Sequence, residues 1–231
     1  MKNSQQGFSI LEMAISLTII GLLVSAVTVG QNVKHSLELN LIVDDVEAIN
    51  LATQEFQATH GSLPGDMYNA ESVFGTGATD NGNGDGDLGT TDGPGTNKNE
   101  KLLFWQHLSL AGLMDGTYDG ATNSSASRKT GQMRDSIYDI SKSTYNSSLN
   151  VTASKANAAT AAGGLGLFTT KEAYDYDVNY DDGDPETGTI RGADGSDASA
   201  GDCIAGVTPN LTYNVSNTVE TPCIVTFYFE Q

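Results

Sequence analysis

Basic residues are scarce in this chain of 231 residues. Eleven Lys and Arg stand against 29 Asp and Glu, which gives a formal net charge of −18. A field of that sign repels the phosphates of nucleic acids and the anionic head groups of lipids. We therefore expect no nucleic acid among the partners of this protein.

Cysteines and the motifs of catalytic sites are also scarce. The two cysteines, Cys203 and Cys223, form no CxxC motif for a metal or for redox chemistry. The three histidines, His35, His60 and His107, are not arranged as HExxH, and no GxSxG elbow occurs. Acidic pairs are so abundant that none stands out as a catalytic pair. We therefore expect a protein that is not an enzyme.

A long apolar run dominates the N-terminal part, from Phe8 to Val29. At ~1.5 Å per residue a helix of this length crosses a hydrocarbon core of ~30 Å. A removable secretory signal and a simple membrane anchor both use such a run. A secretory signal, however, has a more basic start and a shorter apolar core. Neither alternative explains Glu12, because a carboxylate inside a membrane span costs about 3 kcal/mol and needs a partner.

The segment GFSILE at residues 7–12 follows a short polar leader and opens this run. It resembles the class III signal of type IV pilins and of the pseudopilins of type II secretion systems. The resemblance implies that a prepilin peptidase cuts between Gly7 and Phe8 and that Phe8 is then N-methylated. It also implies that Glu12 neutralises the N-terminal ammonium of a neighbouring subunit during assembly. A buried ammonium and a buried carboxylate are each far more costly alone than paired.

By this resemblance the protein is a structural subunit of a type IV pilus-like or type II secretion pseudopilus filament. Its partners would be copies of itself or other pilins, the prepilin peptidase, the inner membrane and the assembly machinery. The implied location is the bacterial inner membrane, with one span and the head in the periplasm, and later a periplasmic pseudopilus or a cell-surface pilus. An alternative from another class is a calcium-dependent adhesin or minor tip subunit that uses the same anchor for extracellular binding.

The apolar helix is expected to continue beyond the membrane as an amphipathic helix. Apolar residues recur every three or four positions at Leu39, Ile42, Val46, Ile49, Ala52 and Phe56. His60 and Gly61 are typical of a helix end. Many pilins have a proline where this chain has Val29 and Gly30, so a kink there would have to come from Gly30.

These patterns divide the chain into four parts. We expect a leader peptide at residues 1–7, a transmembrane and filament-core helix at 8–30, its amphipathic continuation at 31–60 and an extracytoplasmic head at 61–231. The expected fold class is α+β, with a pilin-like long helix on a loop-rich head that contains an antiparallel sheet. Within the head, a helix is expected from Asn97 to Asp115, with Asn97 as N-cap, Glu100 as its capping-box partner and Trp105 in the core.

A loop in the head alternates oxygen-bearing side chains with glycines, as a Ca²⁺ shell of oxygen ligands requires. In the spacing of an EF-hand loop, the expected ligands are Asn81, Asn83, Asp85, Asp87 and Asp92. We expect a weak Ca²⁺ site, with a dissociation constant of about 10⁻⁴ to 10⁻³ M. The alternative is a plain acidic surface loop, because Asn-Gly and Asp-Gly form turns.

A second acidic segment, residues 172–202, holds ten acids and one base. Apolar and polar residues alternate from Tyr174 to Tyr180, which predicts a half-buried strand that leads into an Asp-Gly turn. Asp177, Asn179 and Asp181 are candidates for a second cation site. The alternative is an acidic edge strand that discourages pairing with other sheets.

The C-terminal region ends in a strand-like run from Ile224 to Phe229. Pilins commonly close this region with a disulfide, and the resemblance therefore implies a bond between Cys203 and Cys223. In the chain-entropy model, closing a loop of this length stabilises the fold by ~3 kcal/mol.

Overall fold

The structure is a computed structural model that describes residues 9–89, 99–121, 128–131, 133, 136–142, 148–156 and 164–229, with the helical backbone alone at 28–36, 38 and 39. The chain divides into two compact units, Met1–Asn40 and Leu41–Gln231. Gly7, Phe8 and Asp92 lie outside the described residues.

The first long helix, α1, runs over Ile10–His60 and remains helical through Gly30, where a kink was considered. Its segment Ile10–Val27 is long and apolar enough to cross a membrane, and none of it is buried within the molecule. The helix ends as predicted, because Gly61 adopts φ +71° and donates its N–H to the carbonyl oxygen of Gln57 at 2.8 Å. Only glycine adopts this left-handed conformation without strain.

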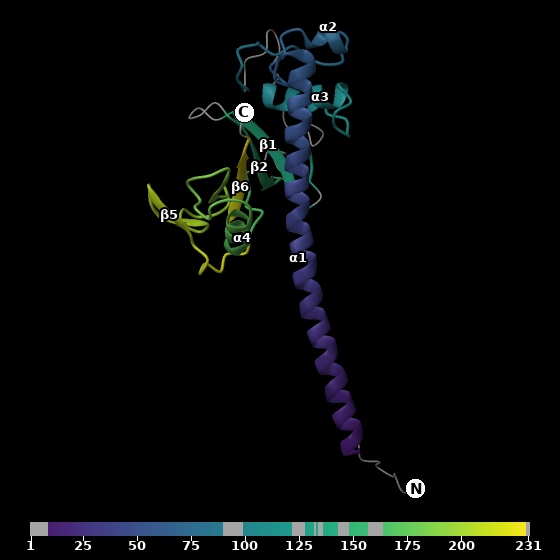
Figure 1. Cartoon of the computed structure of the whole chain (residues 1–231), viewed down its shortest axis with the longest axis vertical. Coiled ribbons are helices and arrows are strands. Elements are labelled where there is room, and N and C mark those ends of the chain that lie inside the picture. The colour runs from purple at the N-terminus through teal and green to yellow at the C-terminus, as the bar shows by residue number, and fades with distance from the viewer. Residues whose placement is uncertain are drawn as a thin grey trace. The chain divides into compact units, whose positions relative to one another are not determined.

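Within the second unit, α1 contributes one apolar stripe to the core. The buried members are Ile42, Val46, Ile49, Ala52 and Phe56, all at most 6% exposed. This confirms the predicted amphipathic pattern for the part of the helix whose side chains are described. Two shorter helices, α2 (Ala70–Phe74) and α3 (Glu100–Leu110), lie beside the C-terminal end of α1 (Figure 1). The rings of Phe56, Phe74 and His107 contact one another there.

The predicted helix around Trp105 exists, but its ends differ from the prediction. Its N-cap is Asn99 rather than Asn97, and the Asn99 side chain accepts the N–H of Lys101. It ends at Leu110 rather than Asp115, because Gly112 adopts φ +72° and closes the last turn. Trp105 is fully buried and lies edge-on to Phe104, with ring centroids 5.0 Å apart, which confirms its place in the core.

The head contains a four-stranded antiparallel sheet in the order β1-β2-β6-β3. Its strands are β1 (Ser136–Lys142), β2 (Leu149–Lys155), β3 (Ile190–Asp194) and β6 (Cys223–Tyr228). A separate hairpin consists of β4 (Ile204–Val207) and β5 (Asn210–Tyr213). The predicted C-terminal strand is thus β6, an inner strand whose Cys223, Val225 and Phe227 face the core. The fold is α+β, as predicted.

The segment Tyr174–Tyr180 was predicted to be a strand, and this prediction is wrong. Residues Thr170–Tyr180 form the helix α4. Thr169 opens it with a capping box: the N–H of Glu172 donates to the Thr169 hydroxyl at 3.1 Å, and the N–H of Thr169 donates to the Glu172 carboxylate. The buried residues lie on one face of the helix, and burial of this face outweighs the two-residue alternation: Thr170, Glu172, Ala173, Tyr176 and Asp177.

The disulfide between Cys203 and Cys223 is present. It links the residue before β4 to the first residue of β6, and both cysteines are fully buried. The hairpin β4–β5 therefore lies inside a covalently closed loop.

Candidate functional sites

The N-terminal segment of α1 has almost no polar surface of its own. The hydroxyls of Ser16, Thr18 and Ser25 donate back to helix carbonyls at 2.7–2.9 Å, which satisfies them without water. The large apolar side chains around them are exposed, from 51% at Ile15 to 89% at Ile10. This surface must be covered by lipid or by other apolar helices, because leaving it in water is unfavourable.

Glu12 is the one charged residue of this segment, and it lies in the first turn of α1. Its carboxylate is exposed and accepts the backbone N–H of Ser9 at 2.9 Å. A carboxylate in the first turn is favoured by the helix dipole, and it lies at the end of the helix that cleavage after Gly7 would bring next to the new N-terminus. The position suits a pairing with an ammonium group.

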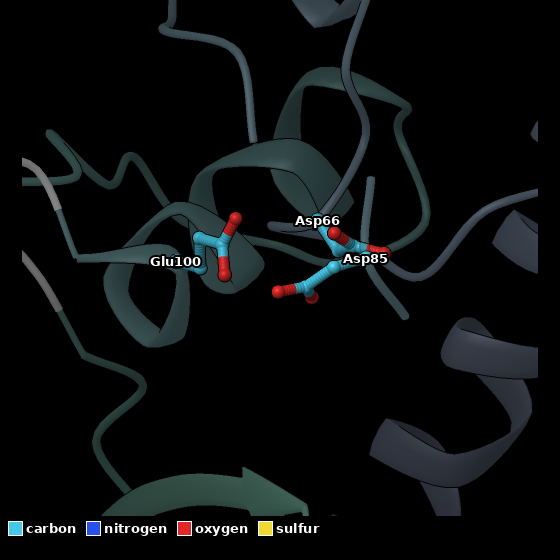
Figure 2. Close-up of side chains that lie close together, drawn as sticks. All are labelled: Asp66, Asp85 and Glu100. Carbon is cyan, nitrogen blue, oxygen red and sulfur yellow. The ribbon is translucent and has the colours of Figure 1, made fainter. Parts of the chain in front are cut away.

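In the head, three carboxylates from three segments converge (Figure 2). Asp66 belongs to the turn after α1, Asp85 to the loop after α2, and Glu100 is the first residue of α3. Ligand-capable oxygens of all three lie within 4.8 Å of one another. Asp66 is 3% exposed and Glu100 is fully buried, while Asp85 is exposed.

The loop of residues 83–89 wraps its backbone around the two buried carboxylates. Gly84 and Gly86 donate their N–H groups to the two oxygens of Asp66, at 2.7 and 3.0 Å. Asn83 and Gly89 donate theirs to the two oxygens of Glu100, both at 2.8 Å. Burial raises the pKa of both carboxyl groups, and these N–H groups oppose the rise.

The predicted ligands are only partly brought together. Asp85 belongs to the cluster, and the Asn83 amide donates to its carboxylate at 2.8 Å. Asn81 instead pairs with Glu71, and Asp87 accepts the N–H of Leu88. Asp66 and Glu100 were not among the ligands predicted from the sequence, because they lie outside the EF-hand spacing and join the cluster only through tertiary structure.

A second cluster of carboxylates consists of Asp177, Asp181 and Asp182, so it contains two of the three residues predicted for a second cation site. The Asp177 carboxylate accepts the N–H of Gly183 at 2.8 Å and the Tyr213 hydroxyl at 2.7 Å. Burial raises the pKa of Asp177 to about 6, although both of these hydrogen bonds oppose the rise. Hydrogen bonds from Thr187 and from the N–H of Asp184 lower the pKa of Asp182.

This second cluster supports the edge of the sheet. Asp181 accepts the N–H of Ile190 at 2.7 Å, and the Tyr213 ring lies against the backbone of Gly192. Both backbone groups belong to the edge strand β3. Residues 174–180 are therefore not an edge strand, as the alternative interpretation had it, because they belong to the helix α4, and Asp181 directly after this helix caps the edge strand β3.

An exposed apolar helix with a single acid in its first turn, followed by an α+β head, defines a protein that is anchored or assembled through its N-terminus. Residues 2–28 match the family model described as the prokaryotic N-terminal methylation motif. This motif is the prepilin-type signal of type IV pilins and pseudopilins, and it confirms the resemblance seen at residues 7–12. The match contains Gly7, Phe8 and Glu12 and leaves the head outside. No curated protein sequence and no solved structure matches the chain.

Proposed function

We propose that this protein is a structural subunit of a type IV pilus-like or type II secretion pseudopilus filament. A prepilin peptidase would process it between Gly7 and Phe8, and it would assemble with other pilins through α1. The observation that carries the proposal is the N-terminal methylation motif at residues 2–28, which opens a helix whose apolar segment Ile10–Val27 has no buried residue.

The apolar surface of this segment is covered differently in the membrane and in a filament. In the membrane, lipid covers the apolar side chains, but a lone ionised Glu12 remains unfavourable there. In a filament, neighbouring helices replace the lipid, and the ammonium of the processed N-terminus of one subunit compensates the Glu12 carboxylate of another. Processing thus creates the charge that the carboxylate needs.

The test is the intact mass and N-terminal sequence of the protein isolated from native envelopes. The proposal expects a chain that begins at N-methylated Phe8. A chain that retains Met1, or one cut near Val27, would mean a simple anchor or a freely secreted domain, and the filament proposal would be withdrawn.

A second candidate function is calcium binding by the head, favoured by the cluster of Asp66, Asp85 and Glu100. Three carboxylates suit a hard cation that takes six to eight oxygen ligands. Each oxygen of Asp66 and Glu100 accepts one backbone N–H, which leaves a second lone pair on each for a cation. Bound Ca²⁺ would offset the repulsion among the three charges. This site is what a calcium-dependent adhesin or minor tip subunit would need.

Calcium is tested by the thermal stability of the full-length protein in detergent, with CaCl₂ or with EGTA. At ten times the dissociation constant, Ca²⁺ raises the free energy of unfolding by about 1.4 kcal/mol. The Asp85→Asn variant should lose this increase, and Asp87→Asn should retain it, because Asp87 is in the same loop but outside the cluster. Equal stability of the unmodified protein in both buffers would remove the calcium hypothesis.

A further inference from the structure

A pocket of about 370 Å³ opens between α4, the loop that follows it and the strand β5. Most of its wall is apolar or aromatic: Tyr174, Pro185, Leu211, Tyr213 and Val215. The half-buried Asp184 also lines it. Nothing in the filament proposal uses this pocket, which lies in the head far along the chain from the assembly signal.

The walls of the pocket are fixed to one another. Asp177 on α4 binds both Gly183 of the loop and the Tyr213 hydroxyl of β5. Glu186 accepts the N–H of Leu211 at 2.9 Å, which joins the loop to β5 a second time. Tyr174 and Tyr213 meet edge to face, with ring centroids 5.8 Å apart. Figure 1 shows the hairpin strand β5 beside α4. The pocket therefore exists before any ligand arrives, which lowers the entropic cost of binding.

Its electrostatic surroundings select the charge of a ligand. The segment 172–202, which supplies the helix and the loop, contains ten acids and one base. Such a concentration of one sign repels anions and attracts cations into a cavity with apolar walls. Asp184 is the acidic residue among those that line the pocket, and its Oδ1 accepts the N–H of Glu186 at 2.9 Å, which holds the side chain in place.

The aromatic and apolar residues of the walls favour a guanidinium over an ammonium group as the bound cation. Tyr174 is 39% exposed, so part of its surface is accessible. A guanidinium group is flat and weakly hydrated, stacks on aromatic rings and binds a carboxylate with directed hydrogen bonds, whereas an ammonium is compact and strongly hydrated. Leu211 and Val215 offer apolar contact to the stem of the side chain and to its apolar neighbours.

We propose that the pocket between α4 and β5 binds an arginine side chain presented by an apolar segment of a partner protein. The guanidinium stacks on Tyr174 and pairs with Asp184, while the apolar neighbours of the arginine contact Leu211 and Val215. The proposal is independent of the filament function, because it concerns the head alone.

The test uses the full-length protein in detergent micelles and three fluorescein-labelled peptides, Leu-Arg-Leu, Leu-Gln-Leu and Leu-Glu-Leu, followed by fluorescence anisotropy. The arginine peptide should bind with a dissociation constant of about 10⁻⁴ to 10⁻³ M, and the glutamine peptide at least about fivefold more weakly. The glutamate peptide should not bind. Equal binding of the arginine and glutamine peptides, or no binding of the arginine peptide at about 10 mM, overturns the proposal.

Two variants locate the binding on the molecule. Asp184→Asn keeps an oxygen for the N–H of Glu186 and removes the charge, so affinity for the arginine peptide should fall about five- to tenfold. Asp175→Asn makes the same charge change at a position on α4 that pairs with Lys171 and does not line the pocket, and affinity should change less than about twofold. Equal losses in both variants would mean that the acidic surface attracts the peptide without the pocket, and the proposal would fall.

Discussion

The backbone N–H of Gly65 donates to Nδ1 of His107 at 2.9 Å. The opposite ring nitrogen, Nε2, lies 3.1 Å from the Thr79 hydroxyl and 3.2 Å from the carbonyl oxygen of Asp80. Because Nδ1 accepts, the proton of the neutral ring belongs on Nε2. One buried imidazole thus joins the turn that carries Asp66 to the start of the loop that carries Asp85.

This arrangement makes stability depend on pH. Burial lowers the pKa of His107 to about 4 from an ordinary value of 6.5. As pH falls below 6.5 the unfolded chain takes up this proton first, so the contribution of His107 to stability declines until pH is about 4. The loss amounts to about 3 kcal/mol. Urea unfolding between pH 7 and pH 4 measures it as the difference from His107→Gln, in which this titration is absent.

The matched control for His107 is His60→Gln, since His60 is only half-buried at the end of α1. The carboxyl groups titrate in the same way in the variant and in the unmodified protein, so their effect cancels in the difference between the two free energies of unfolding. Asp177, with its pKa raised to about 6, acts in the opposite direction, because its folded form takes up a proton first. If His107→Gln has the same pH profile as the unmodified protein, the buried neutral histidine is refuted.

Glu100→Gln should destabilise the head by about 1–3 kcal/mol at neutral pH. One oxygen of the carboxylate becomes an NH₂ group, which then faces the N–H of Asn83 or of Gly89 without an acceptor. Glu55→Gln is the control, because Glu55 is exposed on α1 and its substitution should change stability by less than about 0.5 kcal/mol. Chemical denaturation of both variants without Ca²⁺ measures the effect, and equal midpoints would contradict it.

Gly188→Ala should destabilise the protein more than Gly112→Ala. Both glycines have a positive φ, +69° and +72°, so both substitutions carry the left-handed penalty of about 1–2 kcal/mol. A Cβ at Gly188 would also collide with the Asp181 carboxylate that caps β3, whereas nothing lies within 4 Å of a Cβ at Gly112. The difference between the two melting temperatures isolates the collision, and a larger loss at Gly112 would show that the cap does not require this close approach.

Glu12→Gln should leave the fold of the head intact and abolish incorporation into filaments. The amide fills the same space but cannot compensate an ammonium, so we expect at least about tenfold less assembled protein. Ser16→Ala is the control, since its hydroxyl bonds only within its own helix and its loss should not affect assembly. The measurement is the amount of the protein in filaments sheared from cells, divided by the amount that remains in the membrane fraction. Normal incorporation of Glu12→Gln would contradict the structural role.

The features that sequence predicts well here depend on local patterns. The stripe from Ile42 to Phe56 follows from helical periodicity, and the cleavage motif is contiguous. The error at Tyr174–Tyr180 arose because the same residues satisfy a period of two and a helical face. The capping box at Thr169 and Glu172 was the local signal that favours a helix over a strand at these residues.

The carboxylate cluster was only partly predictable for a different reason. Asp66 and Glu100 are 34 positions apart and meet because α1 and α3 pack through Phe56 and His107. Glu100 was interpreted as a capping residue of its own helix, which is the usual role of a glutamate at a helix start. Its burial is a tertiary property, and no spacing rule contains it. The pocket between α4 and β5 likewise depends on contacts between segments that are distant in sequence.

The cap on β3 has a consequence for crowding. A filament would hold many copies of the head at high local concentration, where an open strand edge recruits further strands into a continuous sheet. With the N–H group of Ile190 already bound to Asp181 and the Tyr213 ring lying against Gly192, that edge offers fewer donors and less access to a neighbouring head. Heads can then be stacked closely and still separate when the filament is taken apart, so the cap would keep assembly reversible.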